Sequence, residues 1–208
     1  MTEIKPTIAI IVAALKPNAG IGFQGKMPWR LRKEIKYFKD VTSKVSSPKN
    51  INAVVMGRKT WESIPKKFRP LPDRINVILS RSYNNEVVEP GVIHANSISN
   101  SLPQLQTYCR SEAQQLERIF IIGGAEIYNE LINDSSVSHL LITEIEHTNH
   151  EAPLQLDTFL NFPIYSQDSV WKKQPTLELK SFVGDDIPLE EDITEGDFVY
   201  NYTLWTRK

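Results

Sequence analysis

One carboxylate stands where the surrounding pattern favours an apolar side chain. At 3.6 residues per turn, a helix over Leu31–Asp40 would place on one stripe the residues Leu31, Glu34, Ile35 and Phe38. A buried acid needs a hydrogen-bonding partner, and burial raises its pKa while a bound cationic ring would lower it. This environment is typical of a functional acid, although a Glu34 at the edge of the stripe, reaching water or a nearby Lys, stays open.

Two segments have the strand–turn–helix form that binds phosphate. Strand Ala53–Met56 leads through Gly57-Arg58-Lys59 to a helix over Thr60–Ile64, with Thr60 as the expected N-cap. Strand Ile119–Ile122 leads through Gly123-Gly124 to a helix that starts at Ala125. Free N–H groups at a helix start attract anions, and paired glycines let a ligand approach the backbone closely. Either turn alone could be purely structural, but together they suggest a dinucleotide.

A third segment indicates which dinucleotide the chain would bind. Ser80-Arg81 directly follows strand Ile75–Leu79 and could bind an outlying 2′-phosphate alongside Arg58. The three cationic candidates Arg58, Lys59 and Arg81 favour NADP over NAD.

The segment Gly20–Met27 matches two better-known motifs only in part. Its first six residues fit GxGxxG, but Pro28 is a poor interior residue for a helix that would begin at these glycines. Gly20–Lys26 nearly fits a P-loop, but Met27 stands where Ser or Thr should hold Mg²⁺. We interpret the segment as a flexible loop over a site.

Strands alternating with helices predict an α/β fold. The expected strands are Thr7–Ala14, Ala53–Met56, Ile75–Leu79, Gly91–Ala95, Arg118–Ile122 and Val137–Ile145. The expected helices are Leu31–Asp40, Thr60–Ile64, Leu102–Leu116 and Ala125–Ile132. We expect a single domain over residues 1–208, with a central, mostly parallel twisted sheet and helices on both faces. Leu177–Val183 and Phe198–Trp205 alternate and predict a C-terminal antiparallel hairpin that closes the sheet.

Charge and composition exclude several classes of protein. The formal net charge of −1 gives no global attraction to nucleic acid. We interpret the basic cluster Lys26–Lys39 first as a solvated helix face, and second as a basic rim that attracts an anionic substrate. The acidic segment Asp185–Asp197 is best read as a solvated loop, with partner binding as the weaker alternative. The longest apolar run, Ile8–Leu15, is too short to span a bilayer, so we expect no membrane partner.

Metal and nucleophile chemistry find no support in the pattern. His147 and His150 are three residues apart but lack a helix or Cys ligands, so no metal is expected. The single cysteine, Cys109, excludes an internal disulfide and suits a reducing compartment.

Three blocks of sequence resemble the signature segments of dihydrofolate reductases: Met27–Glu34, Gly57–Pro65 and Ile122–Tyr128. Further blocks follow in the family's order, at Leu71–Arg74, Leu79–Arg81, Thr143–Ile145, Asp157–Phe159 and Tyr202–Trp205. The resemblance covers nearly the whole chain, and its extra length near residues 43–50, 103–116 and 185–197 is closest to fungal members. Met27 stands where many eukaryotic members carry leucine, a change that should alter pocket shape more than chemistry.

The resemblance implies a role for each matching residue. Glu34 would pair with the pterin, assisted by Thr143, and Trp29 would order a water beside it. The substrate would also contact Ile11, Val12, Ala13, Met27, Phe38, Ile64, Phe68, Leu71, Arg74, Ile122 and Tyr128, with Arg74 pairing with its glutamate α-carboxylate. The cofactor NADPH would contact Ala14, Ile21, Gly22, Gly57, Arg58, Lys59, Thr60, Leu79, Ser80, Arg81, Ile122, Gly123, Gly124, Ala125, Glu126 and Ile127. Gly123-Gly124 would carry the family's cis peptide, and Gly20–Met27 would form a mobile lid.

The implied reaction is NADPH-dependent reduction of 7,8-dihydrofolate to tetrahydrofolate for one-carbon metabolism, with hydride to C6 and a proton to N5. Antifolate inhibitors would bind the same site, and the expected form is a cytoplasmic monomer, a mitochondrial fraction staying open. Two alternatives remain: a related NADPH-dependent reductase of a riboflavin-pathway intermediate, and a non-catalytic folate- or nucleotide-binding protein. Glu34 together with Arg74 favours folate, because a ribityl substrate lacks the glutamate carboxylate.

Overall fold

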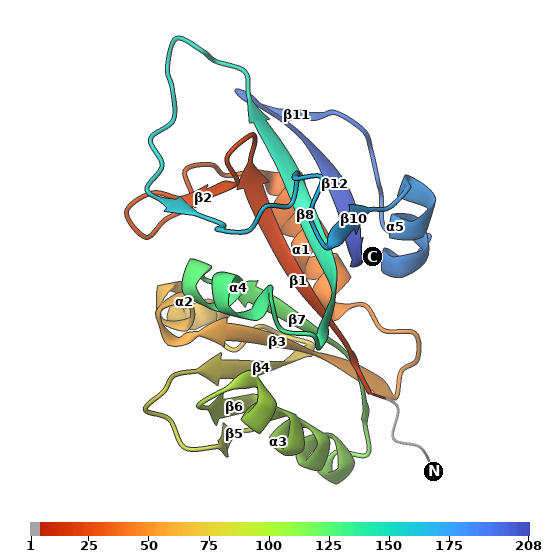
Figure 1. Cartoon of the computed structure of the whole chain (residues 1–208). Coiled ribbons are helices and arrows are strands. Elements are labelled where there is room, and N and C mark those ends of the chain that lie inside the picture. The colour runs from red at the N-terminus through yellow and green to blue at the C-terminus, as the bar shows by residue number, and fades with distance from the viewer. Residues whose placement is uncertain (1–4) are drawn as a thin grey trace. The chain divides into compact units, whose positions relative to one another are not determined.

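A computed structural model describes residues 5–208, and the chain divides into two compact units. Unit 1 contains the described residues up to Ala9 and residues 42–127, and unit 2 contains residues 10–41 and 128–208. Each unit has its own set of paired strands, which Figure 1 labels and colours by their position along the chain.

Parallel strands form the sheet of unit 1. Their order is β7 (Gln115–Gly123), β3 (Asn50–Gly57), β4 (Arg74–Leu79) and β6 (Val92–Ala95), and β5 (Glu86–Glu89) adds an antiparallel edge. Every residue of β4 is buried, as expected of a strand that is covered on both faces. The parallel sheet expected from the sequence is confirmed, while β5 was not foreseen.

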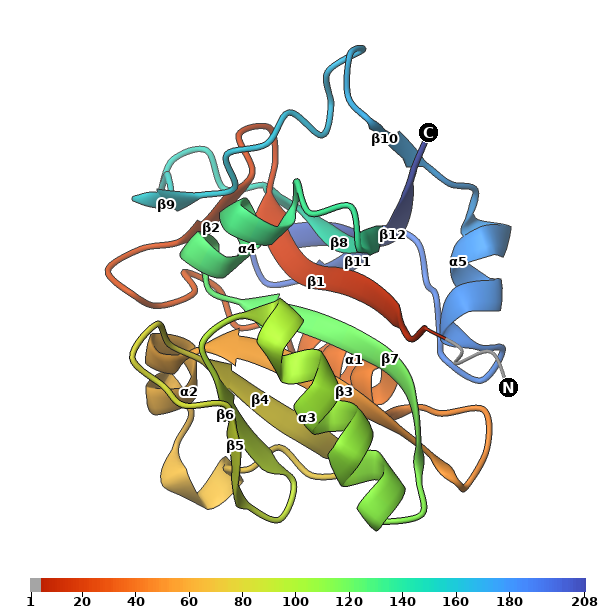
Figure 2. The same ribbon diagram turned by 60° about the horizontal axis from the view of Figure 1, so that its bottom comes forward.

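Helices flank the strands of unit 1. The helix α3 (Ile98–Ser111) lies across β4, β5, β6 and β7 in Figure 2, and Ser97 caps it by accepting a hydrogen bond from the Asn100 N–H at 3.1 Å. The predicted helix Leu102–Leu116 is therefore wrong at both ends, because Gln115 already pairs with Asn50 at the start of β7. The shorter elements are α2 (Arg58–Ser63), the 3₁₀ turn Lys66–Phe68 and α4 (Ala125–Leu131), of which α4 continues into unit 2.

Antiparallel strands dominate unit 2. The long pair β8 (Val137–His147) and β12 (Phe198–Arg207) runs in register from Phe198↔His147 to Thr206↔His139. The short strands β10 (Trp171–Lys173) and β11 (Ile193–Glu195) also pair with β12. Strand β1 (Thr7–Leu15) pairs with β2 (Gly20–Gly22), which pairs in turn with β9 (Thr158–Phe159), and α1 (Arg32–Ser43) lies mostly in this unit.

The predicted partner strand of the C-terminal hairpin is wrong. Leu177–Val183 lies within the helix α5 (Thr176–Val183), where Leu179 and Val183, four residues apart, are buried and Leu177 is 72% exposed. A seven-residue segment with apolar side chains at several spacings fits both the two-residue period of a strand and the 3.6-residue period of a helix. Pro175, directly before Thr176, suits the start of a helix. The partners of β12 are instead β8, β10 and β11, so antiparallel strands close the C-terminal part as expected.

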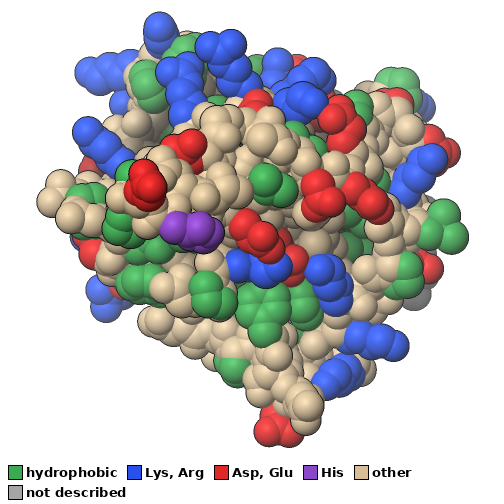
Figure 3. All heavy atoms as spheres, turned by 90° about the horizontal axis from the view of Figure 1, so that it is seen from above, with side chains coloured by type: hydrophobic (Ala, Val, Ile, Leu, Met, Phe, Trp, Pro, Cys, Tyr) green, Lys and Arg blue, Asp and Glu red, His purple; other side chains and the backbone are tan. Residues whose placement is uncertain are grey.

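The α/β class is confirmed. The predicted acidic loop and the balance of surface charge can also be compared with the structure. The acidic segment is a loop up to residue 192, but its last residues form β11 and the turn to β12, so it is only partly a loop. On the face drawn in Figure 3, acidic side chains lie among basic ones across the centre, although Lys and Arg gather at the upper left. Within residues 5–208, no helix is long and apolar enough to cross a membrane.

Candidate active site

Glu34 lies in the first turn of α1 and is 9% exposed. The Thr143 hydroxyl of β8 donates a hydrogen bond to Glu34 Oε1 at 3.4 Å, which is long for such a pair. Burial raises the pKa of Glu34 to about 7; the Thr143 hydrogen bond opposes this rise and the negative charge of Glu195 adds to it. The carboxyl therefore exchanges its proton near neutral pH, as the sequence pattern suggested.

The prediction of which residues share the buried stripe of α1 is partly wrong. Ile35 is 46% exposed, whereas Tyr37, which was not assigned to the stripe, is 5% exposed. Tyr37 stacks on Tyr202 of β12 with ring centroids 3.7 Å apart. The inward face of α1 is therefore formed by residues 34, 37 and 41, a spacing of three and four residues.

Three tyrosine hydroxyls near Glu34 are kept neutral. Burial raises the pKa of Tyr37, Tyr128 and Tyr202 above the ordinary value, and the charge of Glu34 adds to each rise. The Tyr128 hydroxyl donates to the carbonyl oxygen of Ile11 at 2.8 Å and so fixes α4 to β1 within unit 2. The Tyr37 hydroxyl is buried and has no hydrogen-bond partner within residues 5–208.

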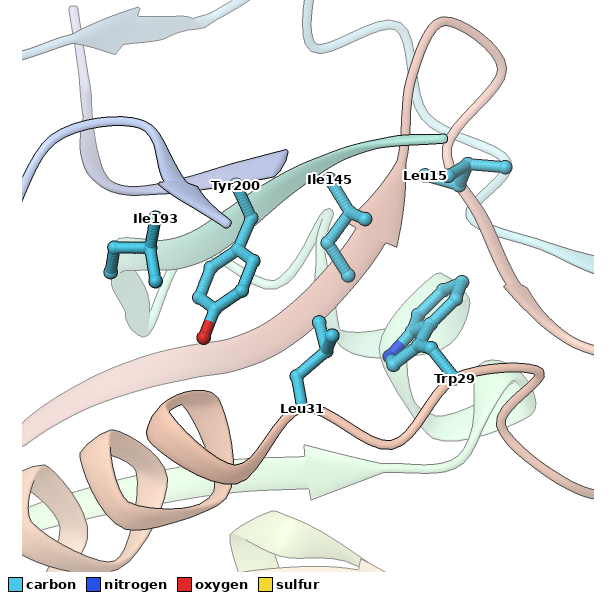
Figure 4. Packing of buried hydrophobic residues seen from close by; sticks show 6 residues of the cluster. All are labelled: Leu15, Trp29, Leu31, Ile145, Ile193 and Tyr200. Carbon is cyan, nitrogen blue, oxygen red and sulfur yellow. The ribbon is translucent and has the colours of Figure 1, made fainter. Parts of the chain in front are cut away.

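Trp29 belongs to a buried cluster that holds the chain entering α1. Figure 4 shows Trp29 and Leu31 pointing from this segment toward Leu15 of β1 and Ile145 of β8. Trp29 is 7% exposed, and its Nε1–H lacks a hydrogen-bond partner in the described part of the chain. A buried donor of this kind is satisfied when a water or ligand acceptor binds beside it.

The remaining predicted contacts of unit 2 lie on β1, on the segment before α1 and on α1. Ile11, Val12 and Ala14 of β1 are buried and Ala13 is half-buried. By contrast, Met27 is 59% exposed, and Phe38 on α1 is intermediate. The burial of β1 therefore suits a wall of a site, whereas Met27 is an exposed residue of the segment before α1.

The predicted lid, Gly20–Met27, is hydrogen-bonded to Asp157 near its centre. Gly22 lies in β2, and its carbonyl oxygen accepts a hydrogen bond from the Asp157 N–H at 3.1 Å. Asp157 Oδ2 accepts one in return from the Gln24 N–H at 2.9 Å. A tight turn follows, in which Gly25 has a φ of +74° that other residues rarely adopt. Ile21, in the same strand, is half-buried.

In unit 1, two glycine turns come close to each other. A Cβ at Gly124 would lie 3.3 Å from Thr60 Oγ1, and one at Gly57 would lie 3.3 Å from Ile127 Cγ1. The Gly123–Gly124 peptide is cis, as the resemblance implied. The helix α2 begins at Arg58 with Gly57 as N-cap, so the prediction of Thr60 as N-cap is wrong and Thr60 lies inside the first turn.

The cationic candidates of unit 1 are exposed and weakly paired. Arg58 lies 3.7 Å from Glu62, and Arg81 lies 3.8 Å from Glu126, with side chains 51% and 95% exposed. Exposed ion pairs of this length contribute little, so these side chains can be drawn to a phosphate. The nearby predicted cofactor residues vary in burial: Lys59 is exposed, Leu79 is buried, and Ser80, Ile122 and Ala125 are intermediate.

Arg74 is buried at the start of β4. Its Nε donates to the Pro72 carbonyl oxygen at 2.8 Å and its Nη1 to the Thr42 hydroxyl at 2.9 Å, and burial lowers its pKa. Two of its five N–H groups are thus used to fix the guanidinium plane. Ile64 and Leu71 are half-buried, whereas Phe68 is 55% exposed.

Two residues near Glu34 were missed by the sequence reasoning. Tyr37 had a helical spacing that could have identified it, whereas Glu195 is brought close only by the pairing of β11 with β12. Residues 5–208 contain no group of three or more His, Cys, Asp or Glu that could hold a metal ion.

The chain is similar over nearly its whole length to known proteins. Residues 7–180 match the family model described as dihydrofolate reductase. The dihydrofolate reductase of Candida albicans is 64% identical over 204 residues, which cover 98% of this chain and 99% of that protein. The corresponding Saccharomyces cerevisiae protein is 41% identical over 214 residues, which cover 98% of each. The solved structure of Schistosoma mansoni dihydrofolate reductase has a TM-score of 0.71 at 29% identity, covering 98% of this chain and 99% of that chain.

Proposed function

The chain belongs to the dihydrofolate reductase family and is an oxidoreductase, and from this premise we propose its substrate, cofactor and site residues. The proposed reaction is NADPH-dependent reduction of 7,8-dihydrofolate to 5,6,7,8-tetrahydrofolate. Its product would supply one-carbon metabolism for thymidylate, purine and amino-acid synthesis. The resemblance to fungal members noted in the sequence agrees with the two fungal relatives.

The observation that carries this proposal is the buried Glu34 with a pKa raised to about 7. A carboxylate in this environment pairs well with a ring N–H and an adjacent amino group, since both donors compensate its burial. The Thr143 hydroxyl holds one oxygen of the acid. In this role Glu34 favours the protonated pterin, and the proton reaches N5 through water that the Trp29 N–H helps to order.

The residues of unit 1 fit a dinucleotide phosphate. The glycine turns at Gly57 and Gly124 leave room at the backbone that a Cβ would fill, and Arg58, Lys59 and Arg81 add positive charge beside the start of α2 and the end of β4. When NADPH is bound it supplies the hydride for C6. The protein's part is to hold the phosphates, align the reacting rings and exclude water.

We propose that Arg74 recognises the carboxylate end of the substrate. Its guanidinium is fixed by Pro72 and Thr42, which lowers the entropy lost when a carboxylate binds in the bidentate manner. The same feature distinguishes folate from a ribityl substrate, which has no such carboxylate. We further propose a cytoplasmic monomer, in keeping with its single, buried thiol at Cys109.

The direct test is NADPH oxidation followed in the near ultraviolet with and without dihydrofolate. We expect folate-dependent turnover that prefers NADPH to NADH and is blocked by methotrexate. A folded protein that binds NADPH but does not turn over dihydrofolate would exclude the proposed substrate. A riboflavin-pathway intermediate would then be assayed in its place.

Glu34→Gln tests the assigned acid. The amide keeps the size of the side chain but cannot carry the charge that favours a protonated pterin, so we expect kcat/KM to fall by roughly 100-fold or more. NADPH binding, measured by quenching of tryptophan fluorescence, should stay within about twofold of wild type. Near-normal turnover at neutral pH would show that Glu34 does not have this role.

A further inference from the structure

The acidic segment 185–197 has no part in the proposed reaction, yet two of its side chains contact the residue next to Glu34. Glu190 Oε2 accepts a hydrogen bond from Lys33 Nζ at 2.8 Å, and both side chains are more than half exposed. Glu195 Oε1 accepts one from the backbone N–H of Lys33 at 3.2 Å. The second contact is made to the helix backbone itself, one residue before the proposed functional acid.

The backbone contact lies where α1 needs an acceptor. The N–H groups in the first turn of a helix have no partner within the helix, and a negative charge near them is favourable. The helix starts at Arg32, so the Lys33 N–H is one of these groups. Glu195 therefore acts on α1 as a capping carboxylate from a strand 162 residues away.

Glu195 is itself held firmly. It pairs with Phe198 across the β11–β12 turn, where Gly196 has a φ of +57°. The hydroxyl of Tyr200 donates to its second oxygen, Oε2, at 3.0 Å. Tyr200 is fully buried and packs in the same cluster as Leu31, the residue before α1, as Figure 4 shows. Both carboxylate oxygens are thus used, one by the anchor and one by the helix.

The rest of the segment borders an open pocket beside α1. A cavity of about 190 Å³ is lined by Tyr37 of α1, Tyr202 of β12, and Ile187 and Pro188 of the segment. Apolar packing on this side comes from Ile187 and Ile193, which are buried, and from the stacking of Tyr37 on Tyr202. Glu195 is thus the acidic residue of the segment that contacts the backbone of the first turn, whereas Glu190 contacts only the exposed end of the Lys33 side chain.

We propose that Glu195 is a positioning residue that fixes the first turn of α1, and with it the carboxyl of Glu34 against Thr143. It bridges the Tyr200 hydroxyl and the Lys33 N–H, and it contacts neither of the two side chains that it aligns. The consequence for turnover rests on the proposed function, whereas the consequence for Glu34 itself does not.

The charge of Glu195 provides a readout that simple loss of packing would not produce. The groups that face Glu34 are Tyr37 on its own helix, Thr143 of β8, Tyr128 of α4, Tyr202 of β12 and Glu195 of β11. Among these, Glu195 is the carboxylate, and its charge raises the pKa of Glu34. Removing that charge therefore lowers the pKa of Glu34.

The experiment compares Glu195→Gln, Glu195→Ala and the control Glu190→Gln in the full-length protein. The pKa of Glu34 is measured by carboxyl ¹³C NMR of ligand-free protein with labelled glutamate, its signal identified by its absence in Glu34→Gln. Turnover is measured in parallel as kcat and KM. We expect both Glu195 variants to lower the pKa of Glu34, and Glu195→Ala to reduce kcat roughly tenfold through misplacement of the acid. Glu190→Gln, which removes only an exposed ion pair, should leave both quantities unchanged.

Tyr200→Phe keeps the hydrophobic cluster and removes only the hydroxyl that anchors Glu195. It should reduce kcat with a smaller effect on KM, and it remains informative if the Glu195 variants fold poorly. A wild-type pKa of Glu34 in Glu195→Gln, or unchanged kcat in both Glu195→Ala and Tyr200→Phe, would overturn the proposal. If wild-type protein fails to reduce dihydrofolate, the proposed function fails, and the NMR comparison still decides the role of Glu195.

Discussion

Glu34 combines a folded-state pKa of about 7 with an ordinary value of 4.5. Burial is the main cause, so the protein spends folding free energy to hold an acid that releases its proton near neutral pH. A group with that midpoint can favour a protonated ligand without being permanently charged. Glu195 increases the effect and Thr143 reduces it, which makes the acid sensitive to its neighbours.

The raised pKa of Glu34 predicts that the difference in unfolding free energy between Glu34→Gln and the wild type changes with pH. Because the folded pKa is raised, the favourable contribution of wild-type Glu34 is complete below pH 4.5 and is lost as pH rises to about 7. The variant carries a neutral amide throughout, so it should gain stability relative to wild type over this range, on the order of 3 kcal/mol at pH 8. Urea unfolding of both ligand-free proteins at several pH values measures the difference. A difference that is constant with pH would contradict the raised pKa.

Most of the proposed cofactor contacts of unit 1 lie where a strand ends and the next element begins. The start of α2, directly after β3, and the glycine pair after β7 approach within contact distance, since a Cβ on Gly124 would lie 3.3 Å from the Thr60 hydroxyl. Parallel strands place their C-terminal ends at one edge of a sheet, which is why two turns 66 residues apart come together in unit 1.

Gly124→Ala tests this arrangement. The added methyl group fills the space over the backbone and displaces Thr60, so we expect the Kd for NADPH to rise roughly tenfold. Fluorescence titration of the folded variant measures it. The matched control is Gly91→Ala in the same unit, where φ is +77° and nothing lies within 4 Å of the new methyl group. The control should lose stability through backbone strain and keep its NADPH affinity, whereas equal affinities in both variants would contradict the proposed site.

At the scale of the whole molecule, the boundaries between the two units fall inside continuous elements. Residues 9–10 lie in β1, residues 41–42 in α1 and residues 127–128 in α4. Unfolding either unit alone would break all three elements. We therefore expect the single domain predicted over residues 1–208 to unfold as one cooperative unit.

Tryptophan fluorescence can test this expectation, because Trp61 lies in unit 1 and Trp29, Trp171 and Trp205 lie in unit 2. Trp61→Phe reports unit 2 alone, and its urea transition should coincide with the loss of circular dichroism of the whole chain. NADPH at about 100 times its Kd should raise the unfolding free energy by about 2.7 kcal/mol with both probes. Two separate transitions, or a shift confined to one probe, would show that the units unfold independently.

Local sequence determined much of this protein by itself. The apolar runs identified the central strands, because buried parallel strands are continuous in hydrophobicity, and the paired glycines marked the turn at Gly123-Gly124, whose cis peptide the resemblance implied. The misplaced acid in a helical pattern identified Glu34, whose burial the structure bears out.

Only the tertiary structure decided the rest. The pattern of Leu177–Val183 fits both a strand and a helix. The segment is a helix because Leu179 and Val183 are then buried on the same face. Glu195 carries no local signal at all, since its place beside α1 depends on the register of β11 with β12 and on the buried hydroxyl of Tyr200. Sequence patterns report the environment of a residue along its own element, whereas contacts between distant elements arise only when those elements pack.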